Sequence, residues 1–177
     1  MDVDVWTPEF PRTSALAPKQ TARWQVERGI AVRVSSKFVA LPERVFDAWL
    51  DSRIAGNWLF ATASRPMTRV TIDPRVGGSF RFADGSNGRA IAYTGRYLEI
   101  VRPRRLVFTL SIASESKAQT RVTTEIAPRD EGCELTLTHE SVPRDQAHRI
   151  EGRWAGILYG LGVTLDQLSA GAGTRLP

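Results

Sequence analysis

The sequence predicts an α+β fold, in which a curved antiparallel sheet of about six or seven strands wraps around one long C-terminal helix. From about Pro143 to Leu168, apolar residues recur three and four positions apart, a spacing that lines one face of a helix. Between Gly78 and Glu140, apolar and polar residues alternate instead, as they do in strands with one buried face. Only the last helix is long enough to cover that face, so we expect the sheet to grip it with a hollow between them.

The predicted domain begins with a strand and two short helices. Residues 30–38 alternate between apolar and polar side chains, which predicts a strand with one buried face. Pro42 then suits the first turn of a helix, and Glu43 follows where an acid suits the helix dipole. Asp51 is expected to cap a second short helix that ends near Trp58. Two short helices in a V shape would close one end of the sheet.

The remaining strands follow one another with short turns, which favours antiparallel pairing. Gly95 lies inside a longer strand and is expected to mark a bulge at which the facing of the strand changes. Glu99, close by, either faces the hollow as an acid or base or pairs with a nearby arginine, and we favour the ion pair. The expected ranges are 69–72, 80–82, 89–101, 106–112, 121–126 and 133–140.

Length and composition favour a single compact domain. We expect it at residues 28–170, between a partly mobile N-terminal extension over 1–27 and a tail over 171–177. The net charge is +5, but the 24 basic residues are scattered among 19 acidic ones, so no nucleic-acid partner is expected. A single cysteine, a start without the pattern of a signal peptide, and no apolar run of about 18 residues predict a cytoplasmic protein without a membrane span.

Four stretches of the sequence carry a family resemblance. They are residues 40–49 (ALPERVFDAW), 73–82 (DPRVGGSFRF), 95–108 (GRYLEIVRPRRLVF), and 135–139 (LTLTH) followed by 151–154 (EGRW). In this order and spacing they resemble the activator-of-Hsp90-ATPase homologue family, within the Bet v 1-like (START-like, SRPBCC) superfamily. The resemblance covers about residues 30–169 and implies a helix-grip fold with an apolar cavity. A role in the stress response is also expected.

The sequence departs from that family in two places. Members that stimulate the chaperone use a separate N-terminal domain as well, and the short extension here has no counterpart to it. A direct chaperone partner is therefore not expected. Many relatives carry paired tryptophans where this chain has Asn57, Trp58 and Leu59. That difference is expected to alter the mouth of the cavity.

Large side chains on the predicted inner faces form the candidate ligand-binding cavity. Tyr93 and Tyr97 would supply hydroxyl groups that orient a ligand. The alternative is an ordinary hydrophobic core, because large aromatic residues dominate cores as well. The candidate residues are Trp58, Phe80, Phe82, Tyr93, Tyr97, Phe108, Leu110, Leu135, Leu137, His139, Trp154 and Leu158.

His139 is the most polar of these candidates. It is in phase with Leu135 and Leu137, so its side chain should point inward near the end of a strand. We expect a histidine satisfied by internal partners, and a general base or a hydrogen bond to a ligand is the alternative. The second histidine, His148, offers no regular ligand spacing with it, so neither a metal nor a cofactor is expected.

Glycines recur in the last predicted helix. Gly152, Gly156 and Gly160 are spaced four residues apart, and each costs about 0.5–1 kcal/mol relative to alanine. They predict either close packing against the sheet or a second copy of the chain, or space left for a ligand. We favour packing. If the helix packs on a second copy of the chain, the protein is a homodimer.

Taken together, these features favour a protein that binds a small apolar or amphipathic molecule, with no catalytic residue assigned. The first alternative is an enzyme of the cyclase or hydratase type, with Tyr93, Tyr97, Glu99 or His139 as acid and base. The second alternative is a protein that interacts with Hsp90 through its surface. Binding is favoured over catalysis because the sequence offers no evident pair of carboxylates for acid–base chemistry.

Overall fold

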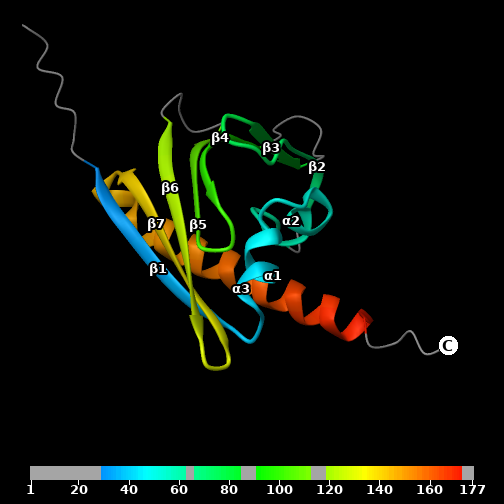
Figure 1. Cartoon of the computed structure of the whole chain (residues 1–177). Helices are drawn as coiled ribbons and strands as arrows, with labels where there is room; N and C mark the ends of the chain where they lie inside the picture. Colours follow the sequence, from blue (N-terminus) through cyan, green and yellow to red (C-terminus); the bar gives the residue numbers. More distant parts are fainter. Residues whose placement is uncertain (1–28, 63–65, 85–90, 113–118, 173–177) are drawn as a thin grey trace, which may run out of the picture.

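The computed structural model describes residues 29–62, 66–84, 91–112 and 119–172. They form the predicted α+β fold: a seven-stranded antiparallel sheet, in the order β1-β7-β6-β5-β4-β3-β2, curls around the long helix α3 (Figure 1). The strands are β1 (Ile30–Phe38), β2 (Met67–Ile72), β3 (Ser79–Asp84), β4 (Ala92–Val101), β5 (Arg105–Ile112), β6 (Thr120–Arg129) and β7 (Gly132–Val142). The helices are α1 (Pro42–Asp47), α2 (Ser52–Trp58), the short 3-10 helix η1 (Arg144–Gln146) and α3 (Ala147–Ala172).

The two short helices begin where the sequence predicts. Pro42 is the first residue of α1, and the carboxylate of Asp51 caps α2 by accepting a hydrogen bond of 2.9 Å from the backbone N–H of Arg53. Figure 1 shows α1 and α2 at the end of the sheet where β2 lies. This confirms that the short helices close one end of the grip.

The first and last strands lie side by side, although more than a hundred residues separate them in the sequence. Ile30 at the start of β1 pairs with Val142 at the end of β7, and Val34 pairs with Leu137. Because β7 leads through η1 into α3, this pairing places the start of the domain beside the start of the long helix (Figure 1). The extension predicted over residues 1–27 lies outside the described residues.

The facing of β4 changes at a different residue from the predicted one. The irregularity in its pairing with β5 lies between Tyr97 and Glu99, so the bulge predicted at Gly95 was wrong in position. A Cβ atom at Gly95 would lie 1.9 Å from the carbonyl oxygen of Thr109, so the glycine permits a close backbone approach. Glu99 forms the expected ion pair, with Arg105 at 3.2 Å.

Helix α3 buries the predicted apolar stripe against the sheet and continues into the predicted tail. Its buried residues include Trp154, Ile157, Leu158, Leu161 and Leu165. The sheet does not approach α3 closely at Gly152, Gly156 or Gly160. A Cβ atom at Gly152 or Gly156 would meet nothing within 4 Å, and one at Gly160 would be 3.7 Å from Trp58. The packing expected against the sheet was therefore wrong at Gly152 and Gly156, and a second copy of the chain stays a prediction there.

The core between the sheet and the short helices is filled with aromatic rings. Trp49 lies 4.8 Å from Trp58 and 6.0 Å from Phe108, and Phe80 lies 5.5 Å from Phe108, as distances between ring centroids. Edge-on and tilted arrangements of this kind are favourable and pack densely. Within the described residues, no helix is both long and apolar enough to cross a membrane.

Candidate functional site

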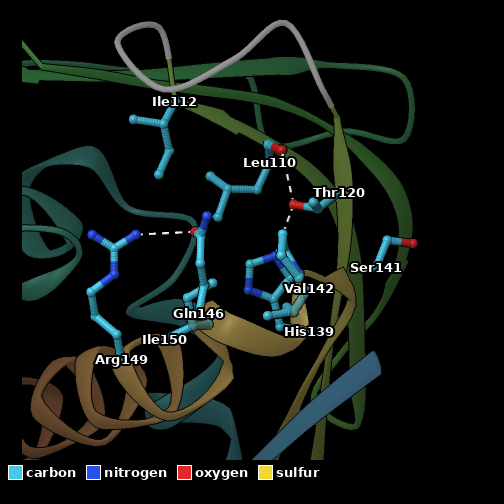
Figure 2. A pocket seen from close by; sticks show the side chains of 10 residues that line it. Leu110, Ile112, Thr120, His139, Ser141, Val142, Gln146, Arg149 and Ile150 are labelled. Carbon is cyan, nitrogen blue, oxygen red and sulfur yellow. Dashed lines mark hydrogen bonds between the residues drawn. The ribbon is translucent and has the colours of Figure 1, made fainter. Parts of the chain in front are cut away.

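A pocket of about 410 Å³ opens between the ends of β5, β6 and β7 and the start of α3. Figure 2 shows side chains from these elements converging on it, with Thr120 between Leu110 and His139 and with Arg149 beside Gln146. The wall on β5 is apolar, the walls on β6, β7 and η1 are more polar, and α3 contributes both apolar and charged side chains. The lining residues are Leu110, Ile112, Thr120, His139, Ser141, Val142, Pro143, Gln146, Arg149 and Ile150.

A smaller hollow of about 40 Å³ adjoins this pocket along α3. The two share Leu110, Ile112, His139, Arg149 and Ile150, so they form one continuous recess, which we name the end pocket. The smaller part is mostly aromatic and aliphatic. The residues that line only this part are Phe60, Tyr93, Arg153, Trp154 and Ile157.

The backbone at the end of β7 positions one side of the end pocket. Ser141 has a φ of 60°, in the left-handed region that few residues other than glycine adopt, and the chain leaves β7 one residue later. Pro143 then precedes η1, and Gln146 and Arg149 follow within the first turns. A sharp change of direction thus brings the start of α3 back across the strand ends, where His139 and Thr120 point toward it.

His139 is held by partners on two other elements. The indole Nε1–H of Trp154 donates to His139 Nδ1 at 3.0 Å, and His139 Nε2 lies 2.8 Å from Thr120 Oγ1. Because an indole N–H can only donate, Nδ1 must be the unprotonated nitrogen, and Nε2 donates its proton to Thr120. The Thr120 hydroxyl in turn donates to the carbonyl oxygen of Leu110 at 3.1 Å. One hydrogen-bonded chain therefore connects α3, β7, β6 and β5.

The electrostatic state of His139 follows from its burial. Only 6 % of the residue is exposed, and burial lowers the pKa of its imidazole to about 4. At neutral pH the ring is therefore uncharged, in agreement with the tautomer assigned from the hydrogen bonds. Both ring nitrogens are engaged, so the contacts agree with the expectation of an inward histidine satisfied by internal partners.

The charged side chains at the end pocket are Arg149 and Arg153. They lie one turn apart on α3, both exposed to solvent, and Arg149 Nη2 donates to the side-chain oxygen of Gln146 at 3.0 Å. In the described part of the chain, neither guanidinium forms an ion pair. The lining residues of both parts of the pocket include no carboxylate.

The candidate cavity residues predicted from the sequence separate into three groups. Leu110 and His139 line both parts of the end pocket, and Tyr93 and Trp154 line its smaller part. A void of only about 10 Å³ in the core is lined by Phe80, Phe82, Tyr97 and Phe108, together with Trp49, Leu59 and Leu106. The remaining candidates, Trp58, Leu135, Leu137 and Leu158, are buried and line none of these three spaces.

Among the described residues, the hollow expected between the sheet and the helix is found at the end pocket, whereas aromatic rings fill the core beside α1 and α2. Sequence reasoning missed several residues that line the open end, among them Ile112, Thr120, Gln146, Arg149 and Ile150. Ile112 and Ile150 lie on the apolar faces of their strand and helix, so the periodicity of the sequence could have identified them. The polar residues carried no such signal. Across the described ranges, no three His, Cys, Asp or Glu side chains come together as a metal site.

Comparisons with known proteins agree with this architecture. A family model described as "Activator of Hsp90 ATPase homolog 1-like protein" matches residues 40–166. A solved structure from Chromobacterium violaceum is 27% identical, with a TM-score of 0.67, over 76% of this chain and 96% of that chain. One from Rhodobacter sphaeroides is 25% identical, with a TM-score of 0.66, over 78% and 93%. The AHSA1-like protein from Aeromonas hydrophila shares the fold at 19% identity and a TM-score of 0.70, over 79% and 94%. No curated protein matches the sequence.

Proposed function

Because the chain belongs to the Activator of Hsp90 ATPase homolog 1-like family, we propose that it uses its helix-grip fold to bind a small apolar or amphipathic molecule. The site is the end pocket. The observation that carries the proposal is an opening of about 410 Å³, whereas the aromatic core beside the short helices leaves a void of only about 10 Å³. Pockets for small molecules commonly measure about 300–1,000 Å³ and combine apolar walls with a few polar groups.

The walls of the end pocket support this function. Leu110, Ile112 and Ile150 offer apolar surface to a ligand, and they line both parts of the recess. The Thr120 hydroxyl accepts one hydrogen bond and donates another, which leaves one oxygen lone pair for a ligand. Gln146 uses its side-chain oxygen for Arg149, and its amide nitrogen is left to donate. A few polar groups on an apolar wall are what orientation of a bound molecule requires.

We assign His139 a positioning role in this function. Its two nitrogens hold the Trp154 indole and the Thr120 hydroxyl, which are both part of the wall of the end pocket. A general base would need a free lone pair, and the lone pair of Nδ1 accepts the Trp154 hydrogen bond. The proposed function is therefore binding, with no catalytic residue assigned.

Two measurements test this proposal. Native mass spectrometry of freshly purified protein would reveal a small molecule that is retained through purification. A fluorescence titration with the neutral apolar probe N-phenyl-naphthylamine would then measure the affinity of the emptied pocket. In Ile150→Trp, the larger side chain should fill the recess and weaken binding of the probe by about tenfold or more.

The matched control is Val163→Trp, which adds the same bulk at an exposed position farther along α3. It should bind the probe as the unsubstituted protein does. Saturable binding that Ile150→Trp leaves unchanged would place the ligand elsewhere, and the absence of saturable binding in the unsubstituted protein would overturn the proposed function.

A further inference from the structure

The two arginines of the end pocket point to the chemical class of its ligand. We infer that the ligand joins an apolar body to an anionic group, such as a carboxylate, and that Arg149 and Arg153 bind this group. The inference rests on the proposed function and narrows it, because that function alone is satisfied by a neutral apolar molecule.

The positions of the two side chains favour joint recognition of one anion. Residues four apart on a helix lie on the same face, one turn above the other. Arg149 lines both parts of the end pocket, and Arg153 lines the smaller part beside Trp154 and Ile157. Both arginines are exposed, so they lie at the boundary between the recess and solvent. An anionic group held there would leave the rest of the molecule against apolar walls.

The local electrostatics add to this argument. Five described arginines are neutralised by acids; for example, Arg102 pairs with Asp47 at 2.7 Å, and Arg105 pairs with Glu125 at 2.6 Å. Arg149 and Arg153 have no such partner in the described residues, and the first turn of α3 contains no acidic residue. Arg149, in the first turn of α3, also faces the positive end of the helix dipole, which is unfavourable for a cation. A bound anion relieves both effects.

The geometry of the guanidinium group suits a carboxylate. Its planar fork presents two parallel N–H donors, which match the two carboxylate oxygens. The Gln146 oxygen accepts from one nitrogen of Arg149, and the other donors of that group are left for a ligand. Because both side chains reach solvent, water screens the attraction, and we expect a preference for acids of about tenfold rather than a larger one.

The test compares acids with alcohols of the same shape by isothermal titration calorimetry. One pair is decanoic acid and decanol, and the other is naphthoic acid and naphthalenemethanol. In at least one pair, the acid should bind about tenfold more tightly than the alcohol at low salt, and added salt should reduce this ratio. The double variant Arg149→Gln/Arg153→Gln should lose the preference, so that the affinities for the acid and for the alcohol become equal within about twofold.

The control is Arg81→Gln, which removes an exposed cation from β3, outside the end pocket. It should keep the preference for the acid. Equal binding of acid and alcohol would overturn the inference and leave the proposed function standing. A preference that persists in the double variant would also overturn it, since other groups would then bind the anion. Failure of all four probes to bind would overturn the proposed function and the inference together.

Discussion

The two ends of the grip differ in what occupies the space inside the sheet. At the end covered by α1 and α2, Trp49, Trp58, Phe80 and Phe108 pack against one another and leave a void of about 10 Å³. At the other end, leucine, isoleucine and threonine line an opening of about 410 Å³. The same curved sheet encloses both ends, so the volume of the inward side chains determines at which end space for a ligand is left.

The ends also differ in how their polar groups are satisfied. Near the closed end, both carboxylate oxygens of Asp47 accept from Arg102, at 2.7 and 2.8 Å. At the open end, a neutral histidine is buried, and two arginines have no acidic partner among the residues that the structure describes. The surface charges Asp47 and Arg102 of the closed end thus neutralise each other, although the indole N–H groups of Trp49 and Trp58 are buried there without a hydrogen bond to any described residue. The arginines of the open end have no such ion pair in the described part of the chain. The following substitutions test this division.

The largest expected effect is the loss of an aromatic ring from the closed end. Phe108→Ala should lower the free energy of unfolding by about 3–5 kcal/mol, because only 2 % of Phe108 is exposed and its removal leaves a cavity. Ile112→Ala, on the same strand but beside the open end, should cost less than about 2 kcal/mol. Urea unfolding of both variants measures the difference. Equal losses would contradict the division into a filled end and an open end.

The second expected effect is a dependence of stability on pH that originates in His139. Burial lowers the pKa of its imidazole from 6.5 to about 4, so between these values the unfolded chain binds more protons than the folded one. The contribution of the neutral His139 to the free energy of unfolding is therefore fully present above about pH 6.5, and it is lost as the pH falls toward 4. The full loss is about 3 kcal/mol, of which about 2 falls between pH 7 and 5.

Urea unfolding at several pH values between 7 and 5 measures this loss. His139→Gln is the control, since its side chain takes up no proton in this range. Arg129 beside Glu134 also lowers the pKa of that carboxyl, and its contribution is lost only below its ordinary value of 4.5, outside the chosen window. An unsubstituted protein whose stability is flat from pH 7 to 5 would contradict a buried neutral histidine at the open end.

A smaller effect of opposite sign is expected on α3. Gly156→Ala should raise the free energy of unfolding by about 0.5–1 kcal/mol, because the added methyl group meets open space and alanine favours the helix. Gly160→Ala should gain at least as much, since its methyl group would make an ordinary van der Waals contact of 3.7 Å with Trp58. Thermal unfolding compares the two. A loss of stability or of dimerisation in Gly156→Ala would indicate that a second copy of the chain packs on this face.

The smallest effect is expected from the ion pair at the surface of the closed end. Asp47→Asn should lower stability by less than about 1 kcal/mol, because both partners are about half exposed and water screens their attraction. A double-mutant cycle with Arg102→Gln isolates the interaction between them. A coupling energy of several kcal/mol would show that this pair, rather than aromatic packing, holds the closed end together.

Much of the fold was predictable from local pattern. The period of apolar residues identified the strands and the long helix, and Pro42 and Asp51 identified the starts of α1 and α2. The site was less predictable. Periodicity placed Leu110, His139 and Trp154 on inward faces, and these residues do line the end pocket. It also placed Phe80 and Phe108 there, and they fill the core instead.

The sequence by itself determined which side chains face inward, because that depends on the repeat of each element along its own backbone. Only the tertiary structure decided where space is left over. The volume enclosed at the end pocket depends on β5, β6, β7 and α3 together, so it cannot be predicted from any single stretch of the sequence. The same holds for charge: Arg105 pairs with acids on the neighbouring strands, whereas Arg149 forms no ion pair within the described ranges. The sequence neighbours of the two arginines do not predict this difference.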